Sequence, residues 1–335
     1  MDNNRDVLLH LLDRLPGHRV VVIGDVMLDE YQFGGARRIS PEAPVLVVDV
    51  ERVSWAPGGA ANVAANVKSL GGEASIIGII GTDDAGNRLR TQLDELGIDT
   101  SGLLEDPHRE TTLKTRIVAG NQQVVRVDRE RRERPDLKMH RRLAQEIKRQ
   151  VPQASAVVTS DYNKGMIGQI TLDSIALANE KGIVFTSNPK PPNLRWFHGA
   201  GLITLNQVEA EAASGESVTD TASAEHAGAK ILEKTQAQAV VVTRGSHGMS
   251  VFQRGRSPEH IPVMPVEVFD VAGAGDSVVS TLTLGLAAGA DIITAARLAN
   301  FAGASVVRKL GVASAVPAEI AHLIRQSGED ENGEG

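Results

Sequence analysis

The stretch FDVAGAGDSVVS, residues 269–280, places two aspartates on either side of a run of small residues. An apolar segment of small side chains follows, and it predicts a helix over 274–288. Gly273 and Gly275 allow backbone conformations and close approaches that a Cβ would prevent. Unpaired N–H groups and the positive end of the helix dipole favour an anion at this point. The stretch alone fits a capping turn and a phosphoryl-transfer site at Asp276 about equally well.

The composition of the 335-residue chain is that of an ordinary globular protein, with 41% hydrophobic residues and a net charge of −7. Its mild acidity argues against a nucleic-acid partner, because neutralising phosphates needs concentrated positive charge. The absence of cysteine excludes disulfides, thiolate catalysis and cysteine-bound metals. Charged residues interrupt the N-terminal leucines, and no apolar run reaches membrane-spanning length. We therefore expect a cytoplasmic protein with no membrane partner.

Short apolar runs alternate with helical segments along most of the chain, which predicts a wide, mostly parallel sheet with helices on both faces. The expected parallel strands are 20–23, 73–81, 155–161, 182–188, 201–206 and 239–245. Antiparallel additions are expected at 248–253 and 259–266. Helices are expected at the N-terminus, after the Pro-Gly-Gly turn at 57–59, and over 84–96, 167–180, 207–213, 223–234, 274–288, 292–310 and 317–326.

Two segments, about 31–55 and 111–128, do not fit this alternation. The first contains a strand pattern at 45–50, and the second is predicted to form a hairpin around 119–121. We interpret them as a small β-sheet lid on one domain that covers 1–326. The charged residues 129–134 are expected to form a solvated loop, and the acidic, glycine-rich tail 327–335 to be disordered.

Ligands of open α/β sheets bind beyond the carboxyl ends of the strands. Asp25 and Asp29 follow the first strand and could accept hydrogen bonds from substrate hydroxyls, or form a turn with a solvated acid. Gly58, Gly59 and Asn62 stand at the start of a helix, where they could approach a polyol or simply begin the helix. The Walker A loop and the Rossmann fingerprint are both absent, so a nucleotide would bind by another scheme.

Two further pairs of polar residues are candidates for phosphate or metal binding. Lys114 and Arg116 share one face of the predicted hairpin, so they could hold a substrate phosphate, although exposed strand charges would give the same pattern. Asn206 and Glu209 lie three residues apart at the start of a helix. They could hold a hydrated Mg²⁺, and a helix-capping arrangement would explain them equally well.

Taken together, these motifs resemble the ribokinase-like carbohydrate kinases over roughly residues 18–325. PGGAANVAANVKSLGG at 57–72 is similar to the N-terminal signature of that family, and DVAGAGDSVVSTLTLGLAAG at 270–289 to the C-terminal one. The resemblance implies a Rossmann-like, three-layer α/β sandwich with a mostly parallel sheet and a β-sheet lid that often forms a dimer interface. Val271 and Ala272 stand where the family has Thr-x, and Asn188 stands where relatives have Asp before Pro-Lys.

The resemblance also implies roles for individual residues, with ATP and Mg²⁺ as cofactors and a homodimer formed through the lid. Asp276 would be the catalytic base, and the N–H groups of Gly273, Ala274 and Gly275 the anion hole. Asp270 would support the loop or the metal's water shell. The nucleotide and its metal would be bound by Asn206, Glu209, Thr243, Arg244, Gly245, Gly273, Gly275 and Asn300. The sugar substrate would be bound by Asp25, Asp29, Gly58, Gly59, Asn62, Lys114, Arg116 and Lys190. A requirement for a monovalent cation stays open.

A narrower resemblance rests on RISPEAPV at 38–45. This string is similar to family members that phosphorylate C1 of D-glycero-β-D-manno-heptose 7-phosphate in lipopolysaccharide inner-core synthesis. Such kinases are often fused to a nucleotidyltransferase with an H-x-G-H motif, which this sequence lacks, so we expect the stand-alone kinase form. The alternatives are a family member acting on ribose, fructose or a tagatose phosphate, and a non-catalytic sugar-phosphate sensor. A sensor would be expected to lack the base or the anion hole.

Overall fold

The computed structural model describes residues 2–120, 122–309 and 311–327. Within these ranges a nine-stranded sheet forms the centre of the molecule, in the order β13-β12-β11-β10-β9-β8-β1-β4-β5. The strands from β11 to β5 in this order are parallel, and β12 and β13 add in antiparallel fashion as predicted. The bounds are β1 Arg19–Gly24, β4 Glu73–Gly81, β5 Asp99–Asp106, β8 Ala156–Ser160, β9 Val184–Asn188, β10 Leu202–Asn206, β11 Ala239–Thr243, β12 Met249–Gln253 and β13 Glu259–Ile261.

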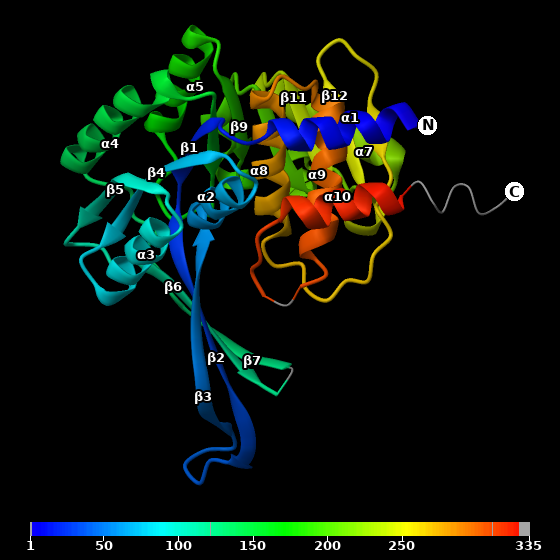
Figure 1. Cartoon of the computed structure of the whole chain (residues 1–335). Coiled ribbons are helices and arrows are strands. Elements are labelled where there is room, and N and C mark those ends of the chain that lie inside the picture. The colour runs from blue at the N-terminus through cyan, green and yellow to red at the C-terminus, as the bar shows by residue number, and fades with distance from the viewer. Residues whose placement is uncertain (1, 121, 310, 328–335) are drawn as a thin grey trace, which may run out of the picture.

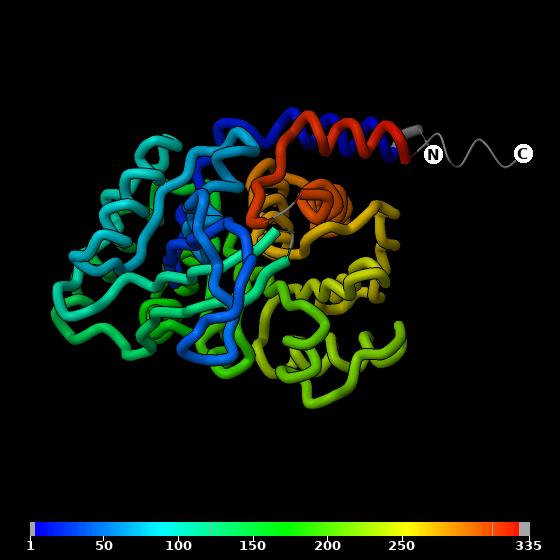
Figure 2. Tube along the Cα trace, turned by 90° about the horizontal axis from the view of Figure 1, so that it is seen from below, coloured from blue at the N-terminus to red at the C-terminus, as the bar shows by residue number. Residues whose placement is uncertain are grey.

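Helices cover both faces of this sheet (Figure 1), because the inner strands are apolar on both sides. Val20 and Val22 of β1 pack into one core, and Val21 and Ile23 into the other. Helices α1 Asp2–Arg14, α2 Ala60–Ser69, α3 Asp84–Glu95, α8 Ala274–Ala287, α9 Ile292–Val306 and α10 Pro317–Gln326 cover the first face. Helices α4 Leu137–Gln150, α5 Gln169–Lys181, α6 Gln207–Ser214 and α7 Thr221–Thr235 cover the second. Figure 2 shows α1 and α10 side by side along one edge.

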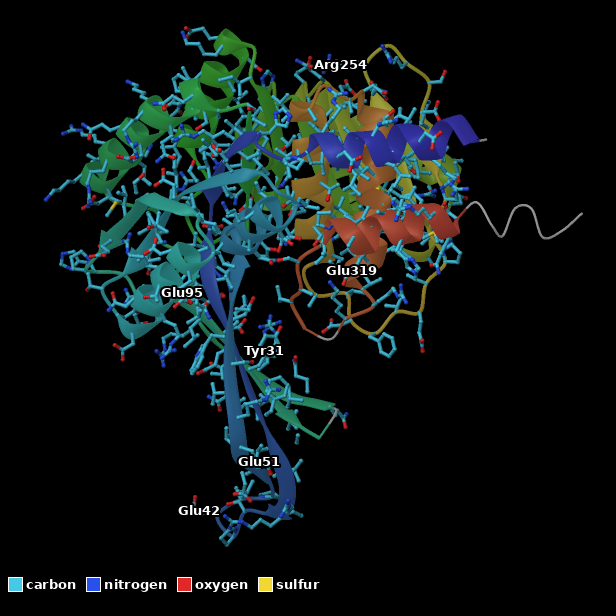
Figure 3. All side chains as sticks on the ribbon, viewed as in Figure 1. Tyr31, Glu42, Glu51, Glu95, Arg254 and Glu319 are labelled. Atoms are coloured by element: carbon cyan, nitrogen blue, oxygen red, sulfur yellow. The ribbon has the colours of Figure 1, made fainter. Side chains whose placement is uncertain are left out.

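A second sheet of four strands in the described residues, β3-β2-β6-β7, projects from the body (Figure 1). Its strands are β2 Val26–Ile39, β3 Leu46–Gly59, β6 Thr112–Ala119 and β7 Gln122–Arg129. Strands β2 and β6 are parallel, while the pairs β2–β3 and β6–β7 are antiparallel. We call this sheet the lid. In Figure 3, Tyr31 lies on the part of the lid near the body, and Glu42 and Glu51 lie toward its far end.

Several elements differ from the sequence-based predictions. Strand β2 begins at Val26 and β3 ends at Gly59, both outside the predicted segment 31–55, so Asp29 lies inside a strand and not in a turn. Helix α4 was not predicted because its sequence is highly charged. Its residues Met139, Leu143 and Ile147, each four positions after the last, nevertheless form a buried stripe. Strand β5 was also missed. Residue 310, the predicted end of α9, and residues 328–335 of the predicted disordered tail lie outside the described ranges.

Among the described residues, none of the helices combines the length and the apolar character needed to cross a membrane.

Candidate active site

A cavity of about 180 Å³ opens at the carboxyl ends of β9, β10 and β11, beside the first turn of α8. This is where ligands of open α/β sheets bind. It brings together five segments of the chain, and four of them contain predicted site residues. The lining residues are Tyr162, Asn188, Lys190, Thr204, Leu205, Asn206, Glu209, Thr243, Gly273, Gly275, Asp276 and Val278.

The carboxylate of Asp276 lies at the mouth of α8 and is only 5% exposed. Its Oδ2 accepts a hydrogen bond of 2.7 Å from Asn62 Nδ2, and its Oδ1 accepts one of 2.9 Å from the Tyr162 hydroxyl. Burial raises the pKa of Asp276 to about 6, while these two hydrogen bonds oppose the rise. The nearby carboxylate of Asp29 adds to the rise, and Lys190 opposes it. A carboxyl group with a pKa near 6 is ionised at neutral pH yet is a better proton acceptor than an exposed aspartate.

The backbone around Gly273 shapes the mouth of the helix. Gly273 has φ of +81°, and a Cβ there would lie 3.1 Å from Asn62 Nδ2. In the described part of the chain, the N–H groups of Gly273, Gly275 and Asp276 have no acceptor, whereas Ala274 N–H donates to Val271 O at 3.3 Å. A Cβ on Gly275 would meet open space. The free N–H groups beside the cavity are suited to a phosphoryl group, as the helix dipole also favours an anion there.

Tyr162 is the main functional residue that the sequence reading missed. It belongs to the loop 161–166 after β8, in the string SDYNKG. Asp25 fixes this loop, because its carboxylate accepts hydrogen bonds from the N–H groups of Tyr162 at 2.8 Å, Lys164 at 3.0 Å and Met166 at 3.1 Å. The contacts therefore give Asp25 a role in holding the loop, while its predicted contact with a sugar stays a prediction. The sequence signal that could have indicated Tyr162 is the polar string SDYNKG directly after the buried strand β8.

Lys190 is held at the floor of the cavity by two other carboxylates. Asp161 accepts hydrogen bonds from the N–H groups of Lys190 and Asn163, both at 2.8 Å. Burial, together with the charge of Asp25, raises the pKa of Asp161 to about 6. Lys190 Nζ contacts Glu209 Oε1 and lies 5.1 Å from the centre of the Tyr162 ring. The ammonium group therefore lies between the base region and the start of α6.

Asn206 and Glu209 form a reciprocal capping box at the start of α6, one of the alternatives for this pair. Asn206 Oδ1 accepts from Glu209 N–H at 2.8 Å, and Glu209 Oε2 accepts from Asn206 N–H at 2.9 Å. In the described residues, no group of three or more His, Asp or Glu side chains could hold a metal ion directly. The pair lines the cavity with lone pairs to spare, so it fits a Mg²⁺ ion held through water.

The predicted sugar-binding residues meet at the base of the lid. Arg116 Nη1 forms an ion pair with Asp29 Oδ1, and its guanidinium lies 5.1 Å from the centre of the Tyr31 ring. A Cβ on Gly58 would lie 2.4 Å from Asp29 Oδ2, so only glycine leaves room for that carboxylate. Gly59 has φ of +57° at the start of α2, which places Asn62 in the first turn. Asp29, Arg116 and Asn62 are thus held near Asp276.

The remaining nucleotide candidates are spread along the edge of the sheet. Thr243 lines the cavity at the end of β11, and Gly245 begins the short turn Gly245–His247 with φ of +55°. Arg244 is buried, and its Nη2 donates to His247 O at 3.2 Å. Asn300 on α9 donates to Pro262 O at 2.9 Å and does not line the cavity.

A buried carboxylate, free N–H groups at a helix mouth and an adjacent cavity are the features expected of a phosphoryl-transfer enzyme of the ribokinase-like fold. The chain belongs to the pfkB family of carbohydrate kinases, whose family model matches residues 18–319. The predicted family, fold and kinase class are therefore confirmed.

Similar curated proteins carry the name "Bifunctional protein HldE". The chain is 42% identical over 303 residues to the one from Desulfatibacillum aliphaticivorans, which covers 90% of the chain and 62% of that protein. It is 43% identical over 301 residues to the one from Geobacter sulfurreducens, covering 90% and 61%. The chain thus spans less than two thirds of the length of these relatives.

Solved structures with the same fold include the phosphofructokinase-2 from Escherichia coli in complex with potassium. Its TM-score is 0.78 at 21% identity, covering 93% of this chain and 99% of that one. The ribokinase of Arabidopsis thaliana complexed with ribose and ATP has a TM-score of 0.74 at 17% identity, covering 92% and 99%. These similarities establish the ribokinase-like fold.

Replacing Tyr162 with Phe should move the acid limb of the pH profile of kcat/KM to higher pH. The hydroxyl of Tyr162 stabilises the ionised form of Asp276, so its loss should raise the pKa of that carboxyl above about 6. A hydrogen bond to a charged group is worth about 1.5–3 kcal/mol, which corresponds to a shift of roughly one pKa unit or more. Tyr31→Phe is the control, since Tyr31 contacts Val312 N–H instead. An unchanged acid limb in Tyr162→Phe would contradict this role.

Proposed function

We propose that the protein transfers the γ-phosphoryl group of ATP to the C1 hydroxyl of D-glycero-β-D-manno-heptose 7-phosphate. The product would be the 1,7-bisphosphate used for ADP-heptose and lipopolysaccharide inner-core synthesis. The observation that carries the transfer chemistry is the buried Asp276 carboxylate at a helix mouth with free N–H groups. The choice of sugar is supported by RISPEAPV at 38–45 and by the similarity to proteins named HldE.

In the proposed reaction, Asp276 takes the proton of the sugar hydroxyl as that oxygen attacks the γ-phosphorus of ATP. The bond to the β,γ-bridging oxygen breaks, and ADP leaves. The free N–H groups of Gly273 and Gly275 stabilise charge on the moving phosphoryl group. Asn206 and Glu209 would hold Mg²⁺ through water, and the bound ion would neutralise phosphate charge.

The two substrates are proposed to occupy opposite sides of Asp276. Asp29, Asn62, Gly58 and Gly59 would contact sugar hydroxyls, since they surround the base on the lid side. The nucleotide would lie along the sheet edge, with these residues as its candidates: Asn206, Glu209, Thr243, Arg244, Gly245 and Asn300. Because the E. coli phosphofructokinase-2 is described in complex with potassium, a comparison of activity in K⁺ and Na⁺ would test a monovalent-cation requirement.

Replacing Asp276 with Asn should lower kcat by at least about 10²-fold, because general-base catalysis is typically worth about 10²–10⁴. Binding of the sugar phosphate should survive, since the amide is nearly the same size. ADP release measures turnover, and calorimetry with the sugar phosphate measures binding. A variant that kept more than about a tenth of the wild-type kcat would refute the assignment of the base.

A panel of acceptors distinguishes the proposed substrate from the alternatives within the family. Heptose 7-phosphate should give the highest kcat/KM, ahead of ribose, fructose and tagatose phosphates. A higher value for one of those sugars would replace the proposed substrate and leave the kinase chemistry intact. Binding of a sugar phosphate without any ATP consumption would instead indicate a sensor.

The lid is the proposed interface of a homodimer. Its outer parts expose a set of large apolar side chains. They are Ile39, Val45, Leu46, Val50, Val124, Val125 and Val127, each more than 40% exposed. A patch of this kind on a projecting sheet is typical of a protein–protein contact. A second copy of the chain, which carries the same patch, would cover it.

A charge on the exposed apolar surface of the lid should break self-association. Val127→Lys places an ammonium group on the lid and should shift the protein from dimer to monomer in sedimentation experiments, because a buried unpaired charge is costly. Val208→Lys, at a valine on α6 that is more exposed than Val127 (72% against 55%), should leave the mass unchanged. Equal masses for wild type and Val127→Lys would contradict the proposed interface.

A further inference from the structure

Two lysines converge on a single glutamate between the lid and the body. Lys164 Nζ contacts Glu130 Oε2, and Lys114 Nζ lies 3.9 Å from the same oxygen. The three residues come from three separate segments: the loop after β8, the residue after β7, and β6. Their side chains are only 11%, 16% and 13% exposed, respectively. Lysines are seldom this buried unless they are paired with an anion.

The cluster borders the site where the sugar is proposed to bind. In the lid, Lys114 is paired with Asp29 across β2 and β6, and side chains of paired strand residues lie on the same face. Glu130 continues the alternation of Arg126 and Asp128 on that face, where Asp128 is paired with Lys114. From the body, Lys164 is two residues after Tyr162, whose hydroxyl contacts the base. The two lysines are therefore next to residues around the proposed sugar site, Lys114 beside Asp29 on the lid and Lys164 two residues after Tyr162 in the body.

The two carboxylate oxygens of Glu130 have different kinds of partner. Burial alone would raise its pKa, but the contacts with Lys164 and Arg132 and the charges of Lys164 and Lys114 hold the pKa of Glu130 below its usual range. Arg132 Nη2 contacts the other oxygen, Oε1, at 2.9 Å and is 67% exposed. Glu130 thus has one oxygen turned to the buried lysines and the other to an exposed arginine, so it can leave the lysines without losing every partner.

The neighbouring carboxylate, Asp128, is less free to move. Arg126 binds both of its oxygens, at 2.8 and 3.0 Å, and Lys114 Nζ lies 3.1 Å from Oδ2. A bidentate arginine contact fixes the carboxylate in one orientation. Asp128 therefore positions Lys114, whereas Glu130 occupies the space between the two ammonium groups.

We propose that Lys114 and Lys164 bind the distal phosphate of the sugar substrate, and that Glu130 is an internal anion that fills this place until the phosphate displaces it. The inference rests on the proposed function, because it requires a sugar that carries a phosphate away from the reacting hydroxyl. A phosphate monoester carries about −1.5 to −2 charges near neutral pH, so it can outcompete one carboxylate for two ammonium groups. Lysine is a common point-charge ligand for phosphate.

Replacing either lysine and replacing Glu130 should change the KM for the sugar phosphate in opposite directions. Lys164→Met and Lys114→Met should each raise KM for the sugar phosphate about 10- to 100-fold, as expected for a lost charge-assisted hydrogen bond. Glu130→Gln should lower that KM several-fold, because it removes the competing anion. Neither effect should appear with the same sugar lacking its phosphate. Lys164→Arg, which keeps the charge, should recover most of the loss, and Lys148→Met on the exposed face of α4 should change nothing.

Inorganic phosphate serves as a second probe. At saturating ATP it should inhibit the wild-type enzyme competitively against the sugar phosphate, more weakly in Lys164→Met and more strongly in Glu130→Gln. This readout does not depend on how stable the lysine variants are, since Glu130→Gln moves in the other direction. If Glu130→Gln raised KM or left it unchanged, Glu130 would be only a tie between lid and body, and the inference would be overturned.

The test of the anion site can be distinguished from the test of the proposed substrate. If another sugar phosphate proves to be the acceptor and shows the opposite-signed effects, the heptose assignment fails while the anion site stands. If heptose 7-phosphate is turned over with the same KM in wild type and in all three variants, the proposed function stands and the anion site is refuted.

Discussion

The burial of one carboxylate, Asp276, is the constraint on which the rest of the site depends. A buried charge is costly unless it is hydrogen-bonded, and here Asn62 and Tyr162 each donate to one of its oxygens. Asn66 in turn orients Asn62, with its Nδ2 donating to Asn62 Oδ1 at 3.2 Å, and accepts from the Ser277 hydroxyl at 2.7 Å. Helices α2 and α8 are therefore joined by a continuous polar network inside an apolar interface. This network gives a physical reason for the asparagines spaced four residues apart in PGGAANVAAN.

The helices and strands that were predicted correctly have a local signal in the sequence. The residue roles that were not predicted depend on partners far away along the chain. The buried strands, the antiparallel edge and the start of α8 follow from apolar runs and glycines, and the structure confirms them. Asp25 could be placed after β1, but its function of holding the loop 161–166 depends on N–H groups about 140 residues away. Tyr162 was missed for the same reason, since only the folded chain brings its hydroxyl to Asp276. The pairing of Lys164 with Glu130 likewise has no local pattern.

The loop 161–166 connects the two halves of the site. Asp25 fixes its backbone, Tyr162 reaches the base, and Lys164 reaches the lid. Asp161, at its start, binds the N–H of Lys190 at the nucleotide side of the cavity. A displacement of this loop would therefore alter the base, the lid contact and the position of Lys190 together. In the proposed reaction, such coupling would favour chemistry only when both substrates are in place, which would limit the transfer of phosphate to water.

Charge balance gives a physical reason why a chain with net charge −7 could admit the two anionic substrates of the proposed reaction. The cations around the cleft are each paired with a carboxylate: Arg116 with Asp29, Lys190 with Glu209 and Lys164 with Glu130. In the absence of substrate these pairs lower the cost of burying the cations. A phosphate that displaces a carboxylate exchanges one ion pair for another. The gain in binding free energy then comes mainly from the stronger attraction of the cation to a dianion than to a monoanion. In the proposed reaction, the pairing would favour ligands whose phosphate groups reach more than one of these cations, since such a ligand offsets the loss of each carboxylate contact that it displaces.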